Sequence, residues 1–115
     1  MRIIHVHTPL SDVKATCHTT YQELIKAVID IRLKVIALDA EMHADLEEVL
    51  LEQGSTQEDL WGFNMYPAGS ATDMFEFTSF INIRPAQSNP SMEILDQSIC
   101  ETIRSITMEL INVSA

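Results

Sequence analysis

Two short apolar runs, separated by two residues, limit the fold of this chain more than any other feature of the sequence. Residues 24–31 and 34–38 are rich in β-branched and aliphatic side chains and have few polar interruptions. Runs of this length and composition are typical of strands that are buried on most of both faces. A tight turn near Arg32 would join them, although it has no Asn-Gly or Asp-Gly pair. The sequence therefore predicts a buried central hairpin.

Weaker signals outside this hairpin predict one more strand and three helices. Residues 2–7 alternate weakly and favour a short edge strand. Ser11 is a suitable N-cap for a first helix, and a second helix is expected over residues 43–53, with Gly54 as its C-terminal stop. Asp96 would cap a final helix whose apolar residues recur at helical spacing. Helices and pairs of strands therefore alternate along the chain.

A second hairpin is predicted between the second and the final helix. Residues 59–66 and 74–84 form its strands, and residues 67–73 form its loop. If the strands pair symmetrically about this loop, Asn64 and Glu76 face each other. Two hairpins joined through a helix favour an α+β fold. We expect a mostly antiparallel sheet of four to five strands, with about three helices covering one face, in the order (β)αββαββα.

Length and charge restrict the classes of function. The chain has 115 residues, which suits a single domain over residues 1–115. Its 17 acidic and 7 basic residues give a net charge of −10, so a protein that tracks nucleic-acid phosphates is not expected. No apolar run approaches the length of a membrane span, and the first residues lack a secretory signal. We therefore expect a cytoplasmic protein that contacts neither nucleic acid nor membrane.

The acidic residues are concentrated around a histidine. Residues 41–59 contain seven carboxylates and no basic residue. Within them, Glu41, His43 and Asp45 could supply a histidine–carboxylate pair for metal ligation or proton transfer. No HExxH motif or second histidine cluster completes the ligand set of a catalytic zinc. The alternative is a solvated helix face, with His43 bonded near the start of the helix.

A second polar group surrounds Arg84, one of two basic residues that follow residue 40. Its planar fork suits a carboxylate or phosphate, and the neighbouring amides can donate and accept hydrogen bonds. A structural ion pair between Arg84 and one of the many carboxylates is the alternative. Taken together, the two groups give a predicted ligand-binding set of Glu41, His43, Asp45, Asn64, Asn82, Arg84, Gln87 and Asn89.

Several sequence blocks between about residues 20 and 95 resemble a known family. They are ALDAEMHADLE (37–47), LLEQGS (50–55), QEDLWG (57–62), Tyr66-Pro67 and INIRP (81–85). In this order they resemble a family of small bacterial proteins classed as a domain of unknown function. The resemblance implies a compact stand-alone protein and no particular activity, and it directs attention to the polar positions within the matching blocks. Arg32-Leu33 stands where the resemblance implies a glycine.

The leading functional hypothesis is a homo-oligomeric binding protein. It would recognise a small polar or anionic ligand, or a protein partner, through the polar face of the second hairpin and the 84–90 loop. Oligomerisation is expected because Leu60 and Phe80 leave that face partly apolar and in need of cover. The first alternative is a divalent-metal-dependent, hydrolase-like enzyme that uses the histidine–carboxylate group. The second is an acidic interaction module that docks a basic partner. The sequence identifies no cofactor and does not decide whether the protein is an enzyme.

Overall fold

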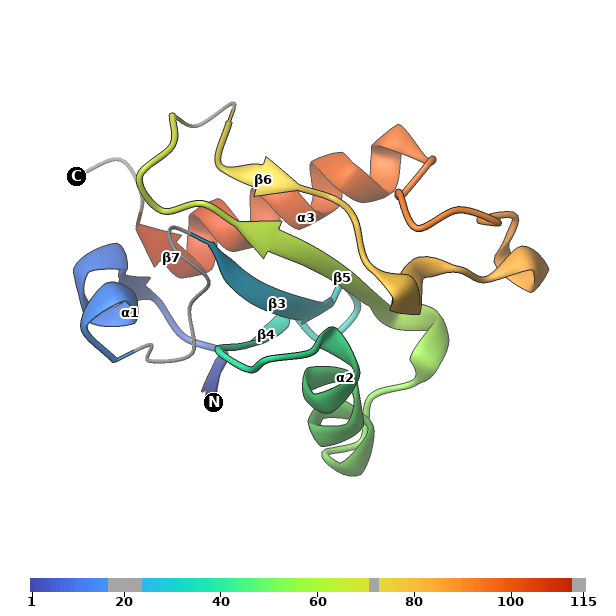
Figure 1. Ribbon diagram of the computed structural model, residues 1–115. Helices are drawn as coiled ribbons and strands as arrows, with labels where there is room; N and C mark the ends of the chain where they lie inside the picture. Colours follow the sequence, from blue (N-terminus) through green and yellow to red (C-terminus); the bar gives the residue numbers. More distant parts are fainter. Residues whose placement is uncertain (17–23, 71–72, 113–115) are drawn as a thin grey trace.

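An antiparallel sheet of five strands forms the centre of the described part of the chain (Figure 1). The strands lie in the order β1-β4-β3-β5-β6, and every pair of neighbours is antiparallel. They comprise β1 (Arg2–Ile4), β3 (Ile25–Asp30), β4 (Val35–Leu38), β5 (Leu60–Met65) and β6 (Phe75–Glu76). The predicted α+β class and mostly antiparallel sheet are therefore confirmed.

The structure is a computed structural model, and it describes residues 1–16, 24–70 and 73–112. Within these segments a second, small sheet joins the two ends of the fold. It consists of β2 (Thr8–Pro9) and β7 (Ile111–Asn112), which are parallel to each other.

Three α-helices accompany the sheets in the described segments. They are α1 (Leu10–Thr16), α2 (His43–Glu52) and α3 (Gln97–Leu110). Gly54 follows α2 with a φ of +105°, the left-handed conformation expected of a helix stop. Asp96 caps α3, because its carboxylate accepts a backbone N–H of the first turn at 2.9 Å. Neither of these described helix ends differs from the sequence prediction, and no described helix is long and apolar enough to cross a membrane.

The central hairpin turns around a buried aspartate instead of a glycine. Oδ1 of Asp30 accepts the backbone N–H groups of Arg32 and Leu33 at 2.9 and 2.8 Å. Oδ2 accepts the hydroxyl of Ser55 at 2.6 Å, which ties the turn to the segment after α2. Lys34 completes the turn in the left-handed region, with a φ of 57°. Side-chain bonds from Asp30 thus supply the turn that an Asn-Gly pair would otherwise supply.

Helices cover both faces of the sheet, so the expectation of a single covered face is wrong (Figure 1). The strands are buried on both sides, and each side needs its own apolar cover. α3 packs on one face with a large cluster that includes Ile25, Ala27, Ile29, Trp61, Phe63, Met65, Ile103 and Ile106. α2 packs on the other face with a smaller cluster that includes Val28, Ala37, Leu46, Leu50 and Leu60.

The long strand predicted over residues 74–84 is not formed. Only β6 pairs with β5, and the chain then enters a 3₁₀ turn, η2 (Phe80–Asn82). The reason is the side chain of Asn82, whose Oδ1 accepts the N–H of Gly62 at 2.8 Å while its Nδ2 donates to the Gly62 carbonyl at 2.9 Å. A side-chain amide therefore pairs with the middle of β5, where the backbone of a neighbouring strand was expected.

Candidate functional site

A row of polar side chains crosses three neighbouring strands of the sheet. Lys26 of β3 lies in register with Asn64 of β5, which in turn lies in register with Glu76 of β6. Residues in register on neighbouring strands project from the same face, so these side chains are neighbours. Asn64 Nδ2 donates to Glu76 Oε1 at 2.7 Å, and the Tyr66 hydroxyl donates to the same oxygen at 3.3 Å. The predicted pairing of Asn64 with Glu76 is therefore confirmed.

His43, the first residue of α2, lies beside this row. Its Nε2 is 2.9 Å from the carbonyl oxygen of Phe63, and its side chain is 9 % exposed. Burial lowers the pKa of His43; the Phe63 carbonyl and the Asn64 amide oppose this effect, and the charge of Lys26 adds to it. The ring is therefore mainly neutral at pH 7. In that state its Nε2–H donates to the carbonyl, and Nδ1 is left as an acceptor.

One polar atom of this group is not satisfied. Asn64 is 9 % exposed, and its Oδ1 is buried with no hydrogen-bond partner among the residues that the structure describes. Reversing the amide would place this oxygen against the carboxylate of Glu76, so its orientation is fixed. A buried acceptor without a donor costs free energy, and a water molecule is the usual donor to such a group.

A cavity of about 160 Å³ lies in front of His43, between β3, η2 and the start of α2. We call it the α2 cavity; the described residues that line it are Lys26, Met42, His43, Ala44, Ser79, Phe80 and Ile81. None of these lining residues is acidic. α2 begins here without a capping side chain, so the backbone N–H groups of its first turn and the positive end of the helix dipole add to the charge of Lys26, whereas the carboxylate of Asp45 in the same turn opposes them. Lys26 is therefore the charged residue among the described residues that line the α2 cavity.

The two carboxylates predicted to act with His43 are not part of this cavity. Glu41 and Asp45 are both exposed, and neither lines it. No group of three or more His, Cys, Asp or Glu side chains within the described segments could hold a metal ion. Nothing in this geometry favours a metal centre around His43.

Arg84 lies elsewhere, buried against β5. Its side chain is 8 % exposed, and its guanidinium lies 4.6 Å from the centre of the Trp61 ring. Burial lowers the pKa of Arg84, and the charge of Glu47 opposes this, but the described residues hold no ion pair to it. Its Nε donates to the Ile81 carbonyl at 3.0 Å, and its Nη2 donates to the Leu60 carbonyl. Its Nη1 donates to the Gln57 carbonyl at 2.6 Å and to the Gln87 side chain at 3.2 Å.

The other amides of this region are also bonded within the chain. Asn89 Nδ2 donates to three backbone carbonyls at 2.7 to 3.0 Å, and its Oδ1 accepts the N–H of Leu95 at 2.9 Å. Asn82 holds β5, as described above. The Gln87 amide donates to the Glu58 carbonyl at 3.0 Å. These contacts show that Asn82, Arg84, Gln87 and Asn89 stabilise the loop. Their predicted role in ligand binding stays a prediction.

The structure thus divides the predicted set and adds residues to it. His43 and Asn64 come together, whereas the residues from Asn82 to Asn89 form a separate network. Sequence reasoning missed Lys26 and Phe80 as site residues. Lys26 could have been found, because it is a lone basic residue within an apolar strand. Phe80 was considered only as part of an apolar face, and it remains 76 % exposed, whereas Leu60 is fully covered by α2.

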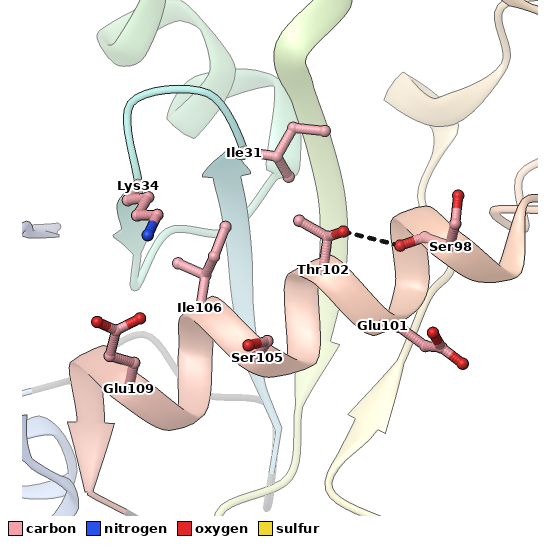
Figure 2. A pocket seen from close by; sticks show the side chains of 8 residues that line it. All are labelled: Ile31, Lys34, Ser98, Glu101, Thr102, Ser105, Ile106 and Glu109. Atoms are coloured by element: carbon pink, nitrogen blue, oxygen red, sulfur yellow. Dashed lines mark hydrogen bonds between the residues drawn. The ribbon is translucent and has the colours of Figure 1, made fainter.

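A larger groove of about 460 Å³ runs along α3, at the end of the central hairpin (Figure 2). Ile31 and Lys34 line it from the hairpin, and hydroxyl and carboxylate side chains line it from the helix. The hydroxyl of Thr102 is already bonded to the Ser98 carbonyl at 2.8 Å. No residue of the predicted set lies in this groove, so the α2 cavity remains the better candidate site.

The fold and the cavity define a small α+β protein with a pocket at the start of one helix that Lys26 lines. The chain belongs to the protein family described as "Protein of unknown function (DUF5674)", whose profile matches residues 2–110. This agrees with the resemblance to a domain of unknown function. Searches of curated proteins and of solved structures gave no match to this chain.

Proposed function

We propose that the protein binds a small anionic ligand in the α2 cavity. The observation that carries this proposal is the convergence of Lys26 and the uncapped start of α2 on one hollow whose described lining residues include no carboxylate. An anion there would interact with the charge of Lys26 and with the first backbone N–H groups of α2, an arrangement that favours oxyanions and carboxylates.

The net charge of −10 does not oppose such a ligand strongly. At physiological ionic strength the Debye length is about 8 Å, so charges on the far side of the protein are largely screened. Charges that line the cavity act at short range and in a lower dielectric, where one ion pair contributes several times more than in water. The local charge therefore decides which ligands bind.

The proposed role is that of a cytoplasmic binding protein, as the sequence suggests. Its expected homo-oligomeric state is a separate prediction, which size-exclusion chromatography at several protein concentrations tests. The metal-dependent alternative has no ligand cluster to support it in the described residues. The acidic module would use α2, whose outer carboxylates are exposed, but exposure of this kind is equally expected of a solvated helix.

The test is a binding titration with acetate and phosphate as probes, followed by amide chemical shifts. We expect saturable shifts at His43 and Ala44, which form the start of α2. Lys26→Met should weaken binding by about tenfold or more, because it removes the charge and keeps the apolar stem. Lys14→Met is the matched control: Lys14 is exposed on α1, away from the cavity, so this variant should bind as the wild type does. Absence of saturable binding, or equal loss in both variants, would overturn the proposal.

A further inference from the structure

The lining of the α2 cavity is more apolar than an anion alone requires. Of the seven described residues that line it, four are apolar: Met42, Ala44, Phe80 and Ile81. Met42 and Ala44 flank His43 at the helix start, and Phe80 and Ile81 belong to η2, which Ser79 caps. The side that η2 forms is therefore mainly apolar, and the charged lining residue, Lys26, comes from β3.

The volume also exceeds what a simple oxyanion needs. A cavity of about 150 Å³ in another protein holds a benzene molecule. At about 160 Å³, the α2 cavity has room for a group the size of an aromatic ring, although an attached anionic group would extend toward its opening. A phosphate or acetate ion would leave much of the apolar side without contact.

Two large apolar side chains are left in water at the rim. Phe80 is 76 % exposed and Met42 is 59 % exposed, and they come from different elements that meet at the cavity. Covering such surface stabilises a complex by about 25 cal/mol for each Å². Phenylalanine and methionine are also well suited to contact a ring, the first by stacking and the second through its flexible thioether.

We infer that the ligand is an amphipathic organic anion, in which a single anionic group is joined to a compact apolar group such as an aromatic ring. This inference rests on the proposed function, because Lys26 and the start of α2 would hold the anionic end. The apolar end would lie between Phe80 and Met42. The alternative occupant of this apolar rim is a second copy of the chain, but a copy would not explain why Lys26 lines the cavity.

The experiment compares benzoate, acetate, phosphate and the neutral isostere benzamide as probes of the wild-type protein. Benzoate should bind about 10- to 30-fold more tightly than acetate, because its ring covers the apolar side. Benzamide should bind more weakly than benzoate, since it lacks the charge. Phe80→Ala should reduce the preference for benzoate over acetate to near unity while acetate binding is kept. Ile83→Ala is the control, because Ile83 is 43 % exposed close to η2 and does not line the cavity.

Each outcome separates the two proposals. If acetate and phosphate bind and benzoate gains nothing, the amphipathic ligand is refuted and the anion site stands. If no probe binds, or if Lys26→Met has no effect, the anion site fails and the inference falls with it. If Phe80→Ala dissociates an oligomer and leaves the benzoate preference unchanged, Phe80 covers a second copy and the inference is refuted. Because Phe80 is exposed, its replacement should not affect folding, which circular dichroism verifies.

Discussion

Replacing Arg84 by lysine distinguishes a structural role from a ligand-binding role for this residue. The change keeps the positive charge that a ligand anion would need. It removes the planar fork, which donates to four acceptors of the chain itself: three backbone carbonyls and the side chain of Gln87. A lysine ammonium is a point charge on a flexible stem and can reach one or two of these acceptors. We therefore expect a loss of stability with little change in ligand affinity.

The size of the loss follows from the contacts. At least two buried acceptors lose a charged donor, and each such bond contributes about 1.5 kcal/mol. Arg84→Lys should therefore lower the free energy of unfolding by about 3 kcal/mol. In a chain of this length that corresponds to a fall in Tm of about 12 °C. The packing of the guanidinium on Trp61, 4.6 Å away, makes this a lower estimate.

The assay is urea denaturation followed by the fluorescence of Trp61, the only tryptophan of the chain, which is 2 % exposed. Arg104→Lys is the control. Arg104 lies 5.7 and 5.2 Å from the ring centres of Phe75 and Phe77 and has no hydrogen bond within the described residues. Its replacement should cost less than about 1 kcal/mol. If Arg84→Lys is as stable as this control but loses affinity for benzoate or acetate, the structural account is wrong and Arg84 contacts the ligand.

Two further predictions concern β5 and α2. Gly62→Ala should destabilise the protein by about 2 kcal/mol in thermal unfolding, because the new Cβ would lie 2.7 Å from Cβ of Ser79. Adding Ser79→Gly to this variant should restore part of the loss. Equal stability of Gly62→Ala and the wild type would contradict the close packing. The pKa of His43 is lowered in the folded state, so the unfolded chain protonates this histidine at a higher pH than the folded protein does. The free energy of unfolding should therefore decrease as the pH falls below about 6.5, by at most about 1.4 kcal/mol for each pH unit. His43→Gln should remove that dependence in urea titrations, and parallel curves for the two proteins would refute it.

Local signals predicted much of the fold. The central hairpin follows from two apolar runs, and the ends of α2 and α3 follow from Gly54 and Asp96, whose effects act within one helix turn. The geometry of the turn between β3 and β4 could not be predicted from the sequence, because Asp30 makes two different sets of hydrogen bonds. It bonds the turn itself and also Ser55, which is 25 residues further along the chain.

The second hairpin shows where local pattern fails. Phe75, Phe77, Ile81 and Ile83 have the alternation of a strand, yet only Phe75 lies in one. Alternation reports which side chains are apolar, but it does not report which backbone groups are paired. The side chain of Asn82 takes the pairing positions of Gly62, and this exchange depends on the packing of η2 against β5, which the sequence pattern does not contain.

The polar residues of the chain fall into two kinds, and their sequence context explains why the site was found only in part. Arg84 drew attention because few basic residues surround it in the sequence. A single arginine is equally expected where several backbone carbonyls need one donor group. Lys26 and Asn64 lie within mainly apolar strands, where burying a polar group costs free energy unless it is hydrogen-bonded. The Arg84 fork meets its partners inside the chain, whereas Asn64 keeps one buried oxygen without a donor. A lysine that lines a cavity is therefore a stronger indication of a ligand site than an arginine whose fork is already bonded within the chain.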